Sequence, residues 1–526
     1  MSLQPVLIAG RWCASDMVAR FRSVNPATGE ALPDEYPTSS WADCDAALIT
    51  AVTASVSLRT VSSERLARFL TRFADRIEAR TNDLVAMAHA ETGLPKSPRL
   101  AEVELPRTTT QLRLAASAAR EGSWMLPTID SKLNIRSMLA PIGPVLVFGP
   151  NNFPFAFNSA AGGDFAAAIA TGNPVIAKAN TSHPGTSRLL AEEAHAASNE
   201  AGLPAGTFQL IYRTSHADGE RLVSDPRVGA IAYTGSRAAG LRLKRAADTA
   251  GKPIYLELSS INPVVILPGA LAERCGQIAS EFVSSCLLGT GQFCTSPSLI
   301  LLHRGKAAEQ FITDVKLKLE TRPTPLLSAG VQRTLGESVQ VLLTVGAEVV
   351  TGGMPISQPG YFFSNTLLRA TGAQFLTAPT AMQTEIFGNV SLVVVVDDSV
   401  EALRVVEHVE GNLTGSIYSD THGSDDEIYN LLVPPLRARV GRLLNDKMPT
   451  GVAVSPAMNH GGPFPATGHP GFTAVGIPAS LRRFGMLQCF DNVRHSRLPA
   501  ALQDANPNGS MWRLIDGRWT QDSFRI

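Results

Sequence analysis

From about residue 143 the chain alternates short apolar runs with longer segments of helical pattern. The apolar runs are rich in β-branched residues, as buried parallel strands are, and the segments between them are long enough for crossover helices. The alternation therefore predicts a parallel sheet wound with helices. The predicted strands cover residues 145–148, 174–179, 208–212, 228–233 and 254–258, and the predicted helices cover 159–171, 182–202 and 236–249.

A second α/β stretch begins near residue 262, with strands predicted at 298–302 and 390–396. It indicates a second domain of the same class. Before the first sheet, residues 63–90 predict one amphipathic helix, because their apolar side chains fall on one helical face. The residues after position 491 are rich in Pro, Asn and Asp and predict an irregular extension that needs another element to pack on.

Composition narrows the class of protein. The 526 residues are 44% hydrophobic and 17% charged, which suits several buried cores. The 46 basic and 46 acidic residues cancel, so nothing attracts the chain to nucleic acid or to an anionic membrane. Six cysteines are too few for a disulfide framework, and no apolar segment reaches the roughly 20 residues that span a bilayer. We expect a cytoplasmic protein with neither nucleic-acid nor membrane partners.

Three side chains that could take part in catalysis lie at strand ends or after a glycine-containing loop. Cys294 follows such a loop, and its thiolate could attack an electrophile unless it is an inert buried cysteine. Glu257 lies in an apolar strand, where a carboxylate needs either a salt-bridge partner or a catalytic task. Asn152 follows the strand 145–148, where its amide could stabilise an oxyanion or simply form a turn.

Common nucleotide and metal motifs are missing from the sequence. It contains no GxGxxG, Walker A or GxSxG motif, and its histidines and cysteines do not have zinc-site spacing, so we expect no bound metal. Gly235 and Ser236 instead lie at a strand-to-helix junction. Backbone N–H groups at such a junction favour a phosphate, although an ordinary helix N-cap is the alternative.

Taken in order, these segments resemble the NAD(P)-dependent aldehyde dehydrogenase superfamily over nearly the whole chain. The matching segments are NPATGE (25–30), NNFPF (151–155), YTGS (233–236), LELSSINP (256–263), GQFCTSP (291–297) and EIFGN (385–389). Two further segments, HGGPFPAT (460–467) and DANPNGSMWRLIDGRWT (504–520), resemble the branch that contains α-ketoglutarate semialdehyde dehydrogenases and related NADP-linked enzymes.

The resemblance implies an aldehyde dehydrogenase-like α/β fold with two doubly wound domains and a small β flap. Residues 1–129 and 143–265 would form the cofactor-binding domain, and residues 266–475 the catalytic domain. Residues 130–142 and 476–526 would form an oligomerisation flap and a C-terminal extension. Because flaps of this kind pair between subunits, we expect a homodimer or a homotetramer.

The resemblance also implies that a small-molecule aldehyde is oxidised to a carboxylic acid. Cys294 would add to the aldehyde, and the Asn152 amide and the Cys294 backbone N–H would hold the thiohemiacetal oxyanion. Glu257 would then activate the water that hydrolyses the thioester. Two departures, Ser259-Ser260 in place of a common Gly pair and Asn389 in place of a frequent Pro, put the local loop geometry in question.

For the cofactor, the resemblance implies contacts with the adenosine ribose, the pyrophosphate and the nicotinamide end. Lys178 would contact the adenosine ribose, Gly235 and Ser236 would contact the pyrophosphate, and Glu385 and Phe387 would contact the nicotinamide end. Thr181 stands where many NAD-preferring relatives have a Glu that repels a 2′-phosphate. Arg213 follows the strand 208–212 and suits phosphate recognition, unless it is only a surface arginine. We predict NADP as the cofactor, with NAD possible.

The substrate pocket implied by the resemblance is apolar, with a basic group. Its predicted residues are Phe153, Phe157, Met458, Phe464, Arg107 and Gln111. An arginine there suits a carboxylate such as that of α-ketoglutarate semialdehyde, although Arg107 could instead pair with Glu104 on the surface. Three alternatives remain open. They are NADP-dependent oxidation of aliphatic or fatty aldehydes, a non-catalytic relative, and CoA-dependent acylation, which the presence of Glu257 disfavours.

Overall fold

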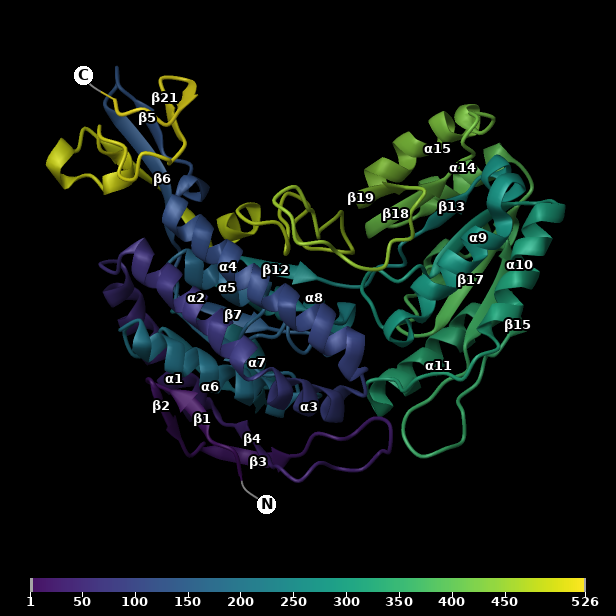
Figure 1. Ribbon diagram of the computed structural model, residues 1–526, viewed down its shortest axis with the longest axis horizontal. Coiled ribbons are helices and arrows are strands. Elements are labelled where there is room, and N and C mark those ends of the chain that lie inside the picture. Colours follow the sequence, from purple (N-terminus) through teal and green to yellow (C-terminus); the bar gives the residue numbers. More distant parts are fainter. Residues whose placement is uncertain (1–2, 525–526) are drawn as a thin grey trace.

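The computed structural model describes residues 3–524 and has two α/β units and a separate β flap (Figure 1). The first unit contains a seven-stranded sheet in the order β12-β11-β7-β8-β9-β1-β2, in which β12 to β9 are parallel and β1 and β2 are antiparallel edge strands. The parallel strands are β7 (Val145–Phe148), β8 (Val175–Lys178), β9 (Phe208–Ile211), β11 (Ala230–Thr234) and β12 (Ile254–Glu257), and the edge strands are β1 (Val6–Ile8) and β2 (Arg11–Cys13). The five predicted strands are present, with ends that differ by no more than two residues.

Helices cover both faces of this sheet, and a small sheet extends its edge. The helices are α1 (Trp41–Leu58), α2 (Ser63–Ala79), α3 (Thr81–Thr92), α4 (Leu105–Glu121), α5 (Gly163–Ala170), α6 (Pro184–Glu200), α7 (His216–Val223) and α8 (Arg237–Thr249). The small sheet has the order β10-β4-β3, formed by β3 (Met17–Phe21), β4 (Tyr36–Ser39) and β10 (Arg213–Thr214).

Two predicted helices differ from the structure. The helix predicted at 63–90 is two helices, because Arg80 has non-helical backbone angles and binds Glu192 and Glu193 of α6. The helix predicted to begin at residue 159 begins at Gly163. At Gly162 a Cβ would lie 2.6 Å from the backbone of Phe157, so this close turn has to be completed before the helix can start.

The second unit contains another seven-stranded sheet, in the order β15-β16-β17-β14-β13-β18-β19, and only the β15–β16 pair is antiparallel. Its strands are β13 (Val264–Ile266), β14 (Leu299–His303), β15 (Glu348–Thr351), β16 (Thr366–Thr371), β17 (Val390–Val396), β18 (Asn412–Tyr418) and β19 (Val440–Asn445). The principal helices around it are α9 (Pro268–Leu287), α10 (Lys306–Leu319), α11 (Ala329–Thr344), α14 (Ser399–His408) and α15 (Asp426–Arg439). Every residue of β17 and β18 is buried, which matches the nearly continuous apolar pattern of β17, whereas β18 also buries Asn412, Thr414 and Ser416.

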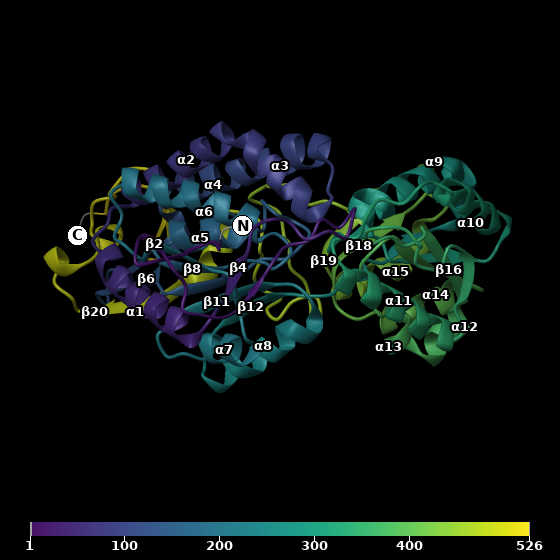
Figure 2. The same cartoon turned by 90° about the horizontal axis from the view of Figure 1, so that it is seen from below.

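The flap is a five-stranded sheet in the order β20-β6-β5-β21-β22. Its strands are β5 (Thr128–Asp130), β6 (Ile135–Pro141), β20 (Gly485–Asp491), β21 (Arg513–Ile515) and β22 (Arg518–Thr520). Figures 1 and 2 place the flap and the second unit at opposite ends of the molecule. The tail predicted to be irregular therefore contains two strands, because β21 pairs with the distant β5 and such pairing leaves no local periodicity.

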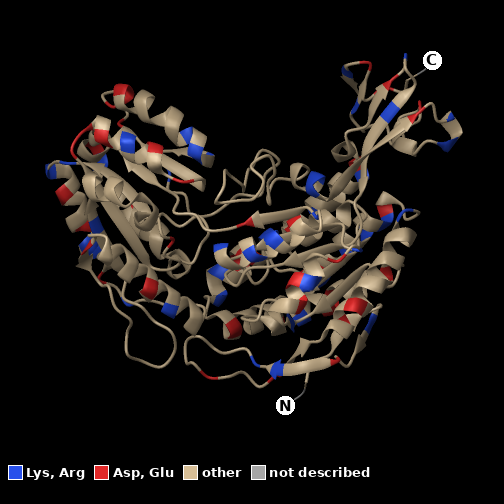
Figure 3. Ribbon diagram, turned by 180° about the vertical axis from the view of Figure 1, so that it is seen from behind, with Lys and Arg blue, Asp and Glu red and all other residues tan. Residues whose placement is uncertain are grey.

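The surface agrees with the balanced composition. Figure 3 shows basic and acidic residues distributed together over the outer helices of both units. Within residues 3–524, no helix combines the length and the apolar character that crossing a membrane would require.

Candidate active site

The loop that carries Cys294 lies between α9 and β14 and has a constrained backbone. Residues 289–291 all have positive φ angles, and a Cβ at Gly291 would lie 2.1 Å from the carbonyl oxygen of Gly388. The Asn262 side chain donates a hydrogen bond of 2.9 Å to the carbonyl of Cys294. Glycine at position 291 and the Asn262 bond together fix where the thiol is presented.

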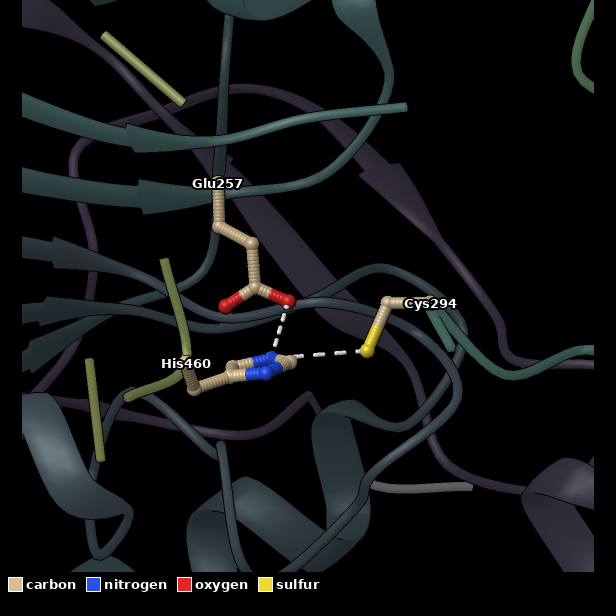
Figure 4. A group of neighbouring side chains, drawn as sticks. All are labelled: Glu257, Cys294 and His460. Atoms are coloured by element: carbon tan, nitrogen blue, oxygen red, sulfur yellow. Dashed lines mark hydrogen bonds and ion pairs between the residues drawn. The ribbon is translucent and has the colours of Figure 1, made fainter. Parts of the chain in front are cut away.

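Two side chains from distant parts of the chain, Glu257 and His460, lie beside this thiol (Figure 4). His460 Nε2 lies 3.5 Å from Cys294 Sγ and 2.7 Å from Glu257 Oε1. Glu257 ends β12, is 5% exposed, and its second oxygen has no partner among the described residues. The imidazole therefore links the thiol to the carboxylate.

His460 is a site residue that was not predicted from the sequence. Its backbone N–H donates to Thr473 Oγ1, and its ring lies 5.7 Å from the ring of Phe157, measured between centroids. A bridge between Glu257 and Thr467 ties the same segment to the end of β12. The available signal was the motif HGGPFPAT, in which a lone histidine stands in apolar sequence.

The protonation of Cys294 depends on these neighbours. Burial, with the adjacent Glu257 carboxylate, holds the pKa of the thiol well above its ordinary range, and the positive charge of Arg107 acts in the opposite direction. The resting protein therefore holds a thiol at neutral pH. Forming the nucleophilic thiolate requires a base within reach.

Asn152 lies beside this loop, as its sequence position after β7 predicts. Its side-chain nitrogen donates to the carbonyl of Gln292 at 2.8 Å, which leaves the second N–H of the amide for another acceptor. Arg99 donates to the Asn152 carbonyl and forms a buried ion pair with Glu104. Glu104 also accepts a hydrogen bond from the backbone N–H of Phe155, so the buried ion pair fixes the loop that follows β7 and carries Asn152.

An aromatic cluster, formed by Phe153, Phe157 and Phe293, packs next to the catalytic loop. Met458 packs against the cluster. The Arg107 guanidinium lies 5.1 Å from the Phe157 ring, and its Nε and Nη2 atoms are buried without a hydrogen-bond partner among the described residues. The surface pair of Arg107 with Glu104 is absent, because Glu104 is buried and bound elsewhere.

The structure places two predicted substrate residues differently. Phe464 is 59% exposed, and its backbone packs closely on Gly411, where a Cβ would lie 2.3 Å from the carbonyl oxygens of both Pro463 and Phe464. Its ring is thus on the surface, and its assignment to the pocket is wrong. Gln111 is buried and donates to the Ala156 carbonyl at 3.0 Å, so it supports the backbone beside the cluster.

A second arginine near the thiol was also missed. Arg442 on β19 donates to the carbonyls of Pro449 and Gly451, and its Nη1 lies 3.7 Å from the sulfur of Met458. It therefore anchors the segment that brings Met458 to the aromatic cluster. No local pattern marks this arginine, because its partners come from a loop that is folded back on it.

A cleft of about 780 Å³ opens at the carboxyl ends of β7, β8 and β11. Its lining contains all five residues predicted for the adenosine and pyrophosphate end, namely Lys178, Thr181, Arg213, Gly235 and Ser236. Burial and the nearby positive charge of Arg213 lower the pKa of Lys178 to about 8. Ser236 begins α8 but makes no capping bond, so its hydroxyl and the helix N-terminus face the cleft without a partner from the helix.

A second cavity, of about 340 Å³, continues from this cleft to the thiol and shares Gly235 and Ser236 with it. It is lined by Asn152, Glu257 and Cys294 and by both residues predicted for the nicotinamide end, Glu385 and Phe387. The two volumes in series, with cationic groups at one end and the thiol at the other, fit a nicotinamide dinucleotide.

The two unusual loop residues are held by buried hydrogen bonds. Ser260 donates to Asn262 at 2.8 Å, and its backbone N–H donates to Glu385 at 3.1 Å. Asn389 donates to the carbonyl of Phe363 at 2.9 Å. The backbone bond of Ser260 thus connects the loop after β12 to the second unit, whereas the Asn389 bond lies within that unit.

This fold and this site define a class of dehydrogenase. The model of the "Aldehyde dehydrogenase family" matches residues 12–431. The chain belongs to this family, whose NAD(P)-dependent enzymes oxidise aldehydes to carboxylic acids.

Two related enzymes and one solved structure are similar to this chain over most of its length. The chain is 38% identical to alpha-ketoglutaric semialdehyde dehydrogenase 2 of Azospirillum brasilense, across 98% of this chain and 100% of that one. It is 36% identical to alpha-ketoglutaric semialdehyde dehydrogenase of Acinetobacter baylyi, across 91% and 92%. A solved mutant aldehyde dehydrogenase from Bacillus cereus has the same fold, with a TM-score of 0.80, 22% identity, and coverage of 93% of this chain and 96% of that chain.

Proposed function

We propose that this enzyme oxidises α-ketoglutarate semialdehyde to α-ketoglutarate and prefers NADP. The observation that carries the substrate assignment is the buried Arg107 guanidinium with two unpartnered nitrogens beside the aromatic cluster. An unpaired buried charge is costly, and the carboxylate of an acidic aldehyde would supply the missing partner. The names of the two relatives from Azospirillum and Acinetobacter support the same substrate.

The first step is addition of the Cys294 sulfur to the aldehyde carbon. The Glu257 carboxylate accepts the thiol proton and passes it to solvent, and His460, whose Nε2–H donates to Glu257 Oε1 at 2.7 Å, holds that carboxylate beside the sulfur. The remaining N–H of the Asn152 amide, with the Cys294 backbone N–H, holds the oxyanion of the thiohemiacetal. Covalent addition places negative charge on the oxygen bonded to the carbon that must lose hydride, and that oxygen then drives the hydride from the carbon.

A nicotinamide cofactor held in this cavity would supply the hydride acceptor. Loss of hydride leaves an acyl thioester on Cys294. Glu257 then activates a water molecule through the oxygen that has no protein partner, and the water releases the acid and restores the thiol. Glu385 and Phe387, which line the same cavity, would hold the nicotinamide ring and its ribose.

The NADP preference rests on charge in the larger cleft. Lys178 and Arg213 face the same volume and repel each other, which a 2′-phosphate between them would relieve. Thr181, which is exposed in this cleft, places no negative charge against the phosphate. NAD, which lacks the phosphate, would bind more weakly.

The predicted oligomer is a homodimer or homotetramer assembled through the flap. The flap carries exposed apolar residues in β20, in β22 and beside β21, namely Met486, Leu487, Trp519 and Trp512. Burial of these side chains against another subunit would supply part of the association energy.

A panel of aldehydes assayed with both cofactors tests this function. We expect the highest kcat/KM with α-ketoglutarate semialdehyde and NADP, lower values with pentanal and hexanal, and no acceleration by coenzyme A. A preference for neutral aldehydes would establish the aliphatic alternative, and CoA-dependent product formation the acylating one. A stoichiometric burst of NADPH without turnover would establish a non-catalytic relative.

A further inference from the structure

The cluster formed by Cys294, His460 and Glu257 has the composition of a zinc site. It offers one sulfur, one nitrogen and one oxygen ligand, and these three atoms lie within 4.8 Å of one another. Thiolate and imidazole select zinc over magnesium or calcium, and three protein ligands plus an open position are usual for accessible zinc. The proposed oxidation makes no use of a metal, so the site would be a property additional to it.

We propose that Cys294, His460 and Glu257 bind Zn²⁺ reversibly and that the bound ion inhibits the enzyme. The ion bonds to Sγ, Nε2 and one carboxylate oxygen, and a water molecule from the cavity completes the tetrahedron. The thiol proton leaves to solvent and no electrons are transferred. Because the nucleophile and its base are then both occupied, the aldehyde cannot be attacked.

The separations in the cluster suit this ion. Zinc bonds of about 2.3 Å to sulfur and about 2.0 Å to nitrogen place the two ligand atoms about 3.5 Å apart in a tetrahedron. Sγ of Cys294 and Nε2 of His460 are 3.5 Å apart. The 2.7 Å between His460 and Glu257 has to widen by several tenths of an ångström, which the carboxylate can allow because its other oxygen is unbonded.

Charge and access also favour zinc at this position. A thiolate, a carboxylate and a neutral imidazole cancel the charge of Zn²⁺, so no net charge is buried. The cavity of about 340 Å³ is lined by both Cys294 and Glu257 and connects them with the cofactor cleft, which provides an entry path. His460 is oriented by its backbone bond to Thr473 and by its contact with Phe157.

Titration of the full-length enzyme with zinc chloride tests the proposal. We expect one Zn²⁺ per chain by equilibrium dialysis, loss of dehydrogenase activity in parallel, full recovery with a chelator, and no effect of Mg²⁺. Cobalt as a spectroscopic probe should give thiolate charge-transfer absorption. Bound cobalt without that absorption, or zinc binding without inhibition, would overturn the proposal.

Variants identify the ligands. Loss of a residue that only hydrogen-bonds to a metal ligand weakens metal binding about 10- to 100-fold. His460→Gln should weaken zinc binding by more than this, because it removes a ligand. Cys294→Ala should abolish the cobalt–thiolate band. Cys489→Ser, at an exposed cysteine in the flap, is the matched control and should change neither. Circular dichroism and NADP binding verify that each variant is folded. Unchanged zinc affinity in His460→Gln would overturn the proposed zinc site. The proposed function is tested separately, by the panel of aldehydes.

Discussion

Replacement of Arg107 by Met should make the protein more stable and a poorer enzyme for acidic aldehydes. Two nitrogens of the guanidinium are buried without a partner among the described residues, and the group lies 5.8 Å and 5.1 Å from the ring centroids of Phe153 and Phe157. A methionine side chain of similar length fills the space and packs well against aromatic rings. The substitution therefore removes a charge while it preserves most of the volume.

The two effects have different sizes. Loss of one partner of a buried charge pair costs about 2–5 kcal/mol, so kcat/KM for α-ketoglutarate semialdehyde should fall about 30- to 4000-fold. A neutral aldehyde of the same length should lose less than about tenfold, as volume-conserving core substitutions do. The free energy of unfolding should rise by about 1 kcal/mol, because relief of the unpaired polar atoms exceeds the lost cation–π contacts.

The assay compares kcat/KM for the two aldehydes and the thermal unfolding midpoint without ligand. Arg113→Met is the matched control on the same helix, since Arg113 binds Asp75 and Glu78 on the surface. It should leave the ratio of the two kcat/KM values unchanged and lower stability slightly. Equal losses for both aldehydes in Arg107→Met, or a lower unfolding midpoint, would refute the role assigned to this arginine.

Three further predictions follow from the geometry of the site. Arg213→Ala should raise KM for NADP by about 5- to 30-fold and leave KM for NAD nearly unchanged, as expected for an exposed charge-assisted phosphate contact; equal changes would exclude that contact. Glu257→Gln removes a charge that raises the pKa of the Cys294 thiol, so the midpoint of iodoacetamide alkylation against pH should move to lower pH, and an unchanged or higher midpoint would contradict this coupling. Phe464→Ser should change kcat/KM by less than about twofold, because the ring is 59% exposed; a tenfold loss would return it to the pocket.

Elements with a strong local pattern could be predicted from the sequence, and elements that depend on distant contacts could not. The strand at 390–396 was predicted with its observed bounds, because a short run of buried residues that is mostly valine strongly favours a strand. The break at Arg80 was not predicted, because the residues that stabilise it lie more than a hundred positions away on α6. Strands β21 and β22 were missed for a similar reason, since three-residue strands gain order only from the sheet that they join.

The same distinction applies to the site. The sequence determined which chemistry the chain carries, because a cysteine after a glycine-containing turn, an acidic residue at a strand end and the surrounding motifs are local features. The tertiary structure decided which groups share the cavity: it placed His460 between Cys294 and Glu257, left two buried nitrogens of Arg107 without a partner among residues 3–524, and turned Phe464 to the surface. These outcomes depend on contacts between segments up to about two hundred residues apart, and one-dimensional spacing does not encode such contacts.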